Sequence, residues 1–237
     1  MDRDRLRRLR GAAARGDGVE VVAALGDSVP VEVLQLAGDG LVLAATVGVG
    51  GAAGLARVCS EALRARAWSG DDELAAALDA ASGNGPMPAL RVLAVDLEEL
   101  SEVLESGLGE GGGLVDLDSG EVWSLTAIEY ADDSEEEAPD FEVPGRWLEV
   151  PAEGLADGYH DMEVFIDAVG DPGCADRLRI AIDGKGAFWR FKDVLARWPE
   201  EEERWYRFSE ERRRGRARQW LADAGYRPAP RRFGAGD

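Results

Sequence analysis

The residues best suited to binding chemistry lie together in the stretch 184–193, Gly-Lys-Gly-Ala-Phe-Trp-Arg-Phe-Lys-Asp. Its two glycines allow a tight turn between helices and a close approach of backbone N–H groups to an anion. Phe188 and Phe191 are expected in the core, which leaves Trp189 and the basic residues to point elsewhere. The stretch is then either the start of a packed helix or a binding surface, and its residue types suit both.

A second set of candidate residues lies in the predicted last helix, Glu200–Ala224. At about 100° per residue, Arg212 and Arg216 fall within the stripe that contains Trp205 and Phe208. Such arginines can lie flat over rings and pair with acids of the same chain, or they can bind phosphate groups. Glutamates interrupt the basic surface and weaken the second interpretation. The candidate anion- or partner-binding surface comprises Lys185, Trp189, Arg190, Lys192, Arg212 and Arg216.

Motifs for nucleotide, metal or nucleophilic chemistry are weak. Residues 48–53 satisfy G-x-G-x-x-A, but no series of alternating strands and helices follows them. Residues 116–121 carry carboxylates around a glycine, but their spacing fits a hairpin turn rather than a calcium loop. His160 is the only histidine, so a histidine-based metal cluster is excluded, and a catalytic dyad would need Cys59 or Cys174 nearby. We therefore expect no cofactor, no metal and no metal- or nucleotide-dependent enzyme, while a carboxylate-based hydrolase or transferase stays open.

The net charge of −20 is distributed unevenly. Residues 1–15 carry six arginines against two aspartates, and residues 184–237 carry 14 basic against nine acidic residues, so residues 16–183 hold a charge of −29. A body this acidic repels nucleic acid and anionic membranes. A long helical N-terminal half and exposed charge of both signs favour a non-enzymatic interaction or regulatory protein with a protein partner. Nucleic-acid binding through the basic C-terminal helices is the alternative.

Cysteine usage and hydropathy indicate the compartment. Cys59 and Cys174 lie far apart and give no disulfide framework, which is typical of a reducing cytoplasm. The arginine-rich N-terminus has no apolar segment after it, unlike a signal peptide. The uncharged run 40–56 is interpreted as two buried helices joined by a glycine turn. We expect a cytoplasmic protein without membrane contact, and the sequence leaves its oligomeric state open.

The sequence predicts a fold of the α+β class in two parts, whose helices and strands must position the candidate binding residues. Residues 1–85 are rich in alanine and leucine at helical spacing, which predicts a helical domain with a basic arm. Glycines and prolines then indicate a linker over 86–95, before a module over 96–226 and a flexible tail over 227–237. Within the module, a hairpin around 118–120 and a strand at 146–150 predict a three-stranded antiparallel meander packed against C-terminal helices.

Several of these motifs occur in the same order in the bacterial Uncharacterised Protein Family 0158, which the chain resembles over roughly residues 90–226. The resemblance rests on the stretch 184–193, the flanking segments Asp161–Ile166 and Arg204–Phe208, the hairpin, and Trp220-Leu221. The helical, alanine-rich residues 1–85 are similar to actinobacterial members. The resemblance implies a bacterial cytoplasmic protein with a small α+β module, and it supplies no catalytic residue.

Overall fold

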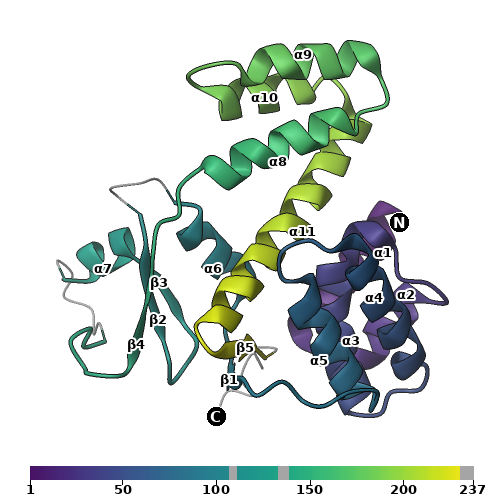
Figure 1. Ribbon diagram of the computed structural model, residues 1–237, viewed down its shortest axis with the longest axis vertical. Coiled ribbons are helices and arrows are strands. Elements are labelled where there is room, and N and C mark those ends of the chain that lie inside the picture. The colour runs from purple at the N-terminus through teal and green to yellow at the C-terminus, as the bar shows by residue number, and fades with distance from the viewer. Residues whose placement is uncertain (107–110, 133–138, 230–237) are drawn as a thin grey trace.

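The computed structural model describes residues 1–106, 111–132 and 139–229. Its N-terminal part is a bundle of helices (Figure 1) that buries a core of leucine, alanine and valine side chains. The predicted flexible tail lies outside the described residues from position 230 onward. The bundle consists of α1 (Arg3–Arg15), α2 (Gly18–Leu25), the 3₁₀ turn η1 (Val31–Val33), α3 (Leu34–Thr46), α4 (Ala52–Arg66) and α5 (Asp71–Ala81).

Glycine at two positions allows α2 and α3 to pack closely. A Cβ atom on Gly18 would lie 2.9 Å from the backbone of Ala44, and one on Gly40 would lie 2.8 Å from Val21. The uncharged run 40–56 forms the end of α3, a glycine turn and the start of α4, as the sequence predicted. Within the described part of the chain, no helix has the length and apolar character needed to cross a membrane.

A small antiparallel sheet lies at the other side of the molecule (Figure 1). It contains β2 (Gly113–Asp116), β3 (Val122–Ser124) and β4 (Trp147–Val150), and α6 (Leu97–Leu104) and α7 (Leu125–Asp132) lie beside it. The α+β class and the three antiparallel strands are confirmed, but their order is β3-β2-β4 rather than that of a meander. Three of the four β2 residues are buried, so this strand takes the centre, and the chain returns through α7 to the far edge.

Two further strands occupy stretches that were expected to be linker and tail. β1 (Arg91–Leu93) and β5 (Tyr226–Pro228) pair in parallel, with Val92 opposite Arg227. Leu93 and Tyr226 join the same core as the sheet and α6. The pair therefore attaches the end of the chain to the start of the module.

A third core lies between α8 (Ala156–Asp167), α9 (Pro172–Ile182) and α10 (Ala187–Leu195). Its centre is aromatic: Phe191 lies 4.7 Å from Trp205 between ring centroids, and Phe165 lies 5.2 Å from Trp205. Edge-to-face rings of this kind add to the stabilisation that burial alone gives.

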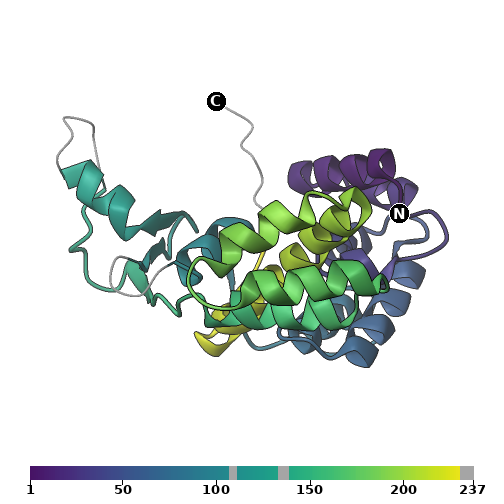
Figure 2. The ribbon, with the colours of Figure 1, turned by 90° about the horizontal axis from the view of Figure 1, so that it is seen from above.

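The last helix, α11 (Pro199–Asp223), runs through the middle of the molecule and contacts all three regions (Figure 1, Figure 2). Proline opens it and glutamates fill its first turn, as the sequence predicted. Trp205 packs into the third core and Leu221 into the sheet core, while Glu211 and Arg218 face the N-terminal helices. Because different faces of α11 meet different neighbours, polar residues are buried along it as well as apolar ones.

Candidate functional site

The turn between α9 and α10, with the start of α10, carries four of the six predicted binding residues, all of them exposed. Gly184 and Gly186 have positive φ angles of 81° and 77°, which let α10 double back along α9. Lys185, Trp189 and Lys192 are exposed, and 83% of the surface of Trp189 is accessible. We call Lys185, Trp189 and Lys192 the turn surface.

Arg190 belongs to the same turn, but its guanidinium is directed back onto the chain. Its Nε donates to the carbonyl oxygen of Ala181 at 2.9 Å, and one terminal nitrogen donates to the backbone carbonyl oxygen of Asp183 at 2.5 Å. The other terminal nitrogen donates to the carbonyl oxygen of Lys185. Arg190 thereby satisfies carbonyl groups at the C-terminal end of α9 that helix geometry leaves unpaired. Its observed contacts fix the shape of the turn.

Arg212 and Arg216 lie where α11 meets α8, around the buried carboxylate of Asp161. The Nε of Arg212 donates to one oxygen of Asp161 at 2.8 Å, and a terminal nitrogen of Arg216 donates to the other at 2.8 Å. Arg212 also lies over the ring of Trp68, 5.2 Å from its centroid, and Arg216 pairs with Glu105. Burial opposes the charge of Arg216, but Asp161 and Glu105 raise its pKa above the ordinary value.

The structure thus brings Lys185, Trp189, Arg190 and Lys192 together on one turn and places Arg212 and Arg216 in an internal ion-pair cluster. Both arginines pair with an acid of the same chain and Arg212 also lies over aromatic rings, which is one of the two interpretations that the sequence left open. Whether the six residues bind an anion or a partner stays a prediction.

The sequence did not point to Glu211, which is buried and binds the start of a helix in another part of the chain. Its carboxylate accepts hydrogen bonds from the backbone N–H of Gln35 at 2.8 Å and of Leu36 at 3.1 Å, in the first turn of α3. Val33, which precedes α3, offers no side-chain cap. Glu211 therefore caps α3 from α11. The missing local cap is the one sequence signal that could have indicated such a partner.

Arg66 extends this contact into a buried polar network. It binds Glu211 at 2.9 Å and holds Asp71 through two nitrogens, at 2.9 Å and 2.8 Å. Arg218 of α11 donates to the side-chain oxygen of Gln35 at 2.9 Å and to Asp39 at 2.6 Å. Burial alone would lower the pKa of Arg66, but hydrogen bonding to Asp71 and attraction by Glu211 raise it, so the guanidinium stays charged.

A close glycine contact lies beside the network. A Cβ atom on Gly215 of α11 would lie 2.2 Å from the carbonyl oxygen of Ser69, and one on Gly70 would lie 2.1 Å from the carbonyl oxygen of Gly215. Only glycine at both positions lets the start of α5 lie directly on α11. The N-terminal helices are therefore joined to α11 by backbone contact as well as by charge.

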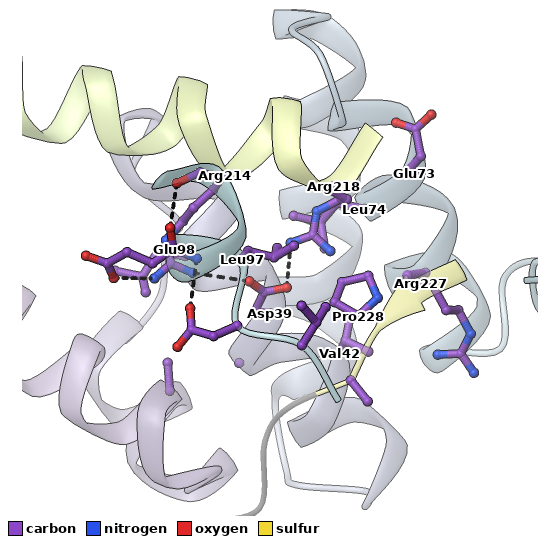
Figure 3. Close-up of a pocket in the computed structure, with 18 of the residues that line it drawn as sticks. Asp39, Val42, Glu73, Leu74, Leu97, Glu98, Arg214, Arg218, Arg227 and Pro228 are labelled. Atoms are coloured by element: carbon purple, nitrogen blue, oxygen red, sulfur yellow. Dashed lines mark hydrogen bonds and ion pairs between the residues drawn. The ribbon is translucent and has the colours of Figure 1, made fainter. Parts of the chain in front are cut away.

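A pocket of about 610 Å³ opens at this junction (Figure 3). Its wall combines α1, α3 and α5 of the N-terminal domain with α6, α11 and β5 of the module. Asp39 pairs with Arg218 across the junction, and Arg214 lies between Asp39 at 3.6 Å and Glu98 at 3.4 Å. Pockets of this size between domains are common binding sites for small molecules.

Metal and nucleotide chemistry find little support in the part of the chain that the structure describes. There, no group of three or more histidine, cysteine, aspartate or glutamate residues is placed to hold a metal ion. The helix α3 precedes residues 48–53, where a nucleotide fingerprint requires a strand. Both cysteines are free and buried, and burial raises the pKa of the Cys59 thiol far above its ordinary value.

Comparisons with known proteins identify relatives of the C-terminal part of the chain. The model of the uncharacterised protein family UPF0158 matches residues 92–232. The UPF0158 protein PA5073 of Pseudomonas aeruginosa is 31% identical over 150 residues, which cover 60% of this chain and 90% of that protein. No solved structure matches the chain. The match confirms the resemblance seen in the sequence motifs and begins after the N-terminal helical domain. The chain therefore belongs to the uncharacterised protein family UPF0158.

Proposed function

We propose that this chain is a non-enzymatic interaction protein that docks a partner protein through the turn surface, with Trp189 as the anchor. The observation that carries the proposal is the exposure of Trp189, at 83%, on a turn whose other aromatic residues are packed inward. Tryptophan buries a large area when a partner covers it, and it is enriched among residues that dominate binding energy.

The turn holds Trp189 in a defined position. Phe191, two residues further along α10, is buried against Phe165 and Trp205, and Arg190 binds the carbonyl groups that end α9. A side chain presented by an ordered element loses little conformational freedom when it binds, which favours affinity. These contacts support a surface that is ready to bind before a partner arrives.

The charges beside Trp189 indicate what kind of partner fits. Lys192 lies one helical turn from Trp189, and neither it nor Lys185 has an ion-pair partner among the described residues. Ile180, on the neighbouring helix α9, is also 76% exposed. We expect a protein surface with an apolar pocket for the indole and carboxylates around its rim.

The contacts of the basic residues favour a protein partner over nucleic acid. On α11, Arg212 and Arg216 bind Asp161, and Arg214 lies among acidic side chains. In α1, Arg10 pairs with Glu210 of α11. Phosphate contacts need cations that are free to replace counterions, so these pairs weaken the alternative of nucleic-acid binding.

A carboxylate-based hydrolase or transferase has less support. The buried carboxylates Asp71, Asp161 and Glu211 are all bound by arginines, as in structural ion pairs. The two cysteines are free, which accords with the reducing cytoplasm of a bacterium as the site of action.

The test is affinity isolation from a nuclease-treated native lysate with four forms of the full chain. Trp189→Ala removes the anchor, and Lys185→Glu with Lys192→Glu reverses the rim charge. Tyr130→Ala is the matched control, because Tyr130 is 78% exposed on α7. We expect one polypeptide to be retained by the wild type and the control and lost by both turn variants.

Two outcomes would count against the proposal. Identical sets of retained proteins for all four forms would show that Trp189 is not the anchor. Self-association of the purified wild type, measured by light scattering and abolished by Trp189→Ala, would identify a second copy as the occupant instead.

A further inference from the structure

The pocket at the domain junction contains hydrogen-bond donors that the chain does not satisfy. In the described part of the chain, five buried side-chain nitrogen atoms make no well-aligned hydrogen bond, and three of them belong to arginines that line this pocket. They are the Nε atoms of Arg213, Arg214 and Arg227. Buried donors are rarely left unpaired, so a group that supplies acceptor oxygens suits the pocket.

Arg227 is the arginine best placed to hold such a group. Arg213 and Arg214 each have a carboxylate nearby, with Arg213 Nε 3.1 Å from Glu105 and Arg214 Nε 3.5 Å from Glu210. For Arg227, on β5, no acidic partner is found in the residues that the structure describes. A guanidinium presents several donors in a fixed plane that matches a carboxylate or a phosphate.

Part of the pocket lining is apolar. Val42 of α3, Leu74 of α5, Leu97 of α6 and Pro228 of β5 line the same pocket as Arg227 (Figure 3). An inorganic anion would use none of this surface, whereas a molecule with an apolar body would remove it from water. Apolar walls with a few polar groups are the usual form of small-molecule sites.

Other charges limit where a negative group can sit. Asp39, Glu98 and Glu210 of the lining are paired with arginines. Glu73, on α5, has no such partner within the described ranges, so it repels an anion on its side of the pocket. This leaves the side of β5 for an anionic head group.

We propose that the pocket binds a small amphipathic anion, whose carboxylate or phosphate pairs with Arg227 and whose apolar body lies against Val42, Leu74 and Pro228. Such a ligand would touch α3 and α5 of the N-terminal domain and β5 of the module together. Its binding would stabilise the docked arrangement of the two, because a ligand that binds only the docked form favours it by mass action. The site is separate from the turn surface and does not depend on the proposed function.

The test titrates the full chain with octanoate and octyl phosphate, and with octyltrimethylammonium as a cationic probe of equal chain length. Methyl NMR resonances of Val42 and Leu74 report on the pocket, and those of Leu178, buried in the third core, serve as the internal control. We expect saturable shifts at Val42 and Leu74 with at least one anionic probe, none at Leu178, and none with the cation.

Arg227→Gln should weaken anionic binding roughly tenfold or more, because it removes the charge and most donors. Arg57→Gln is the control, since Arg57 is exposed on α4 outside the pocket and pairs only with Glu61 among the described residues. We expect Arg227→Gln to keep the circular dichroism spectrum of the wild type. If it does not, Arg227→Lys replaces it in the titration, with an expected affinity between those of the wild type and Arg227→Gln. Absent shifts with both anions, or equal affinity for the Arg227 and Arg57 variants, would overturn the proposal.

Discussion

Glu211 shows how one side chain can take over a role that local sequence normally fills. The helix α3 begins after Val33 without a side-chain cap, and Glu211 of α11 accepts the hydrogen bonds of its first turn. Burial raises the pKa of Glu211, while Arg66 and the two backbone donors act against this. The charged form of the Glu211 carboxylate is therefore stabilised by Arg66 and the backbone donors of α3, and Glu211 in turn accepts their hydrogen bonds.

Removing this carboxylate should be costly. Glu211→Ala leaves the buried charge of Arg66 with Asp71 alone and exposes unpaired N–H groups, so we expect a loss of about 3–5 kcal/mol in the free energy of unfolding. Glu61→Gln, which removes an exposed pair with Arg57, should cost less than about 1 kcal/mol. Urea unfolding of both variants measures the difference, and equal losses would contradict the structural role of Glu211.

Asp116 should contribute a pH-dependent part of the stability. Hydrogen bonds from Arg146 hold its pKa below the ordinary value, with a further contribution from the backbone N–H of Asp118. Because the folded carboxyl binds a proton less readily than the unfolded one, with a pKa of about 3.9, this contribution is present above about pH 4. It is lost as the pH falls through the folded pKa.

Unfolding free energies measured between pH 6 and acid should therefore fall less steeply in Asp116→Asn than in the wild type. Asp176→Asn, at an exposed pair, should keep the wild-type slope.

Single-residue chemistry was only partly accessible from the sequence. The exposure of Trp189 and the location of Arg212 beside Phe208 follow from helical spacing, which is a local property. That Arg212 and Arg216 share Asp161 depends on how α8 crosses α11, and no local pattern contains this. The pairing of Glu211 with α3 joins residues 176 positions apart and was equally out of reach.

At the scale of elements, the contact between α5 and α11 rests on Gly70 and Gly215. A methyl group on Gly215 would lie 2.2 Å from the carbonyl oxygen of Ser69, so Gly215→Ala should force the two helices apart. We expect a loss of about 1–3 kcal/mol in the free energy of unfolding, the usual cost of overpacking.

A matched control for this substitution lies in α4. Gly54 is helical and has open space around its Cβ position, so Gly54→Ala should leave stability unchanged or raise it by up to about 1 kcal/mol. Thermal and urea unfolding should therefore show a loss of stability for Gly215→Ala and no loss for Gly54→Ala. If Gly215→Ala were as stable as Gly54→Ala, the close backbone contact would not be essential.

Helices and strands were predicted correctly where the residues that determine them lie close together in the sequence. Proline and acidic residues indicated the start of α11 to within one residue, because caps and the helix dipole act locally. The order of the sheet strands was missed, since it depends on the path of the chain between β3 and β4. The pairing of β1 with β5 joins the two ends of the module and has no signal in either short segment alone.

At the scale of the whole molecule, residues 92–232 match the family model, and the helices of residues 1–81 lie outside that match. The cores of the module contain no residue of 1–83, and the core of the helical domain contains none of the module. What joins them is mainly polar or backbone contact, including Glu211 with α3, Arg218 with Asp39, and Gly215 with Ser69, together with an edge-to-face contact between the rings of Trp68 and Phe208. Two separately cored units joined in this way can fold separately.

Deleting residues 1–83 tests this organisation and separates the two proposed surfaces. The remaining chain keeps both module cores, so circular dichroism should show a cooperative unfolding transition, at a lower temperature because Glu211 and Arg218 lose their partners. Partner capture through Trp189 should persist, since the turn surface is built on α9 and α10. Binding of octanoate or octyl phosphate should be lost with Val42 and Leu74, which form one wall of the pocket. A truncated chain that unfolds without cooperativity would show instead that α11 needs the N-terminal helices to hold its shape, and the chain would then be a single folding unit.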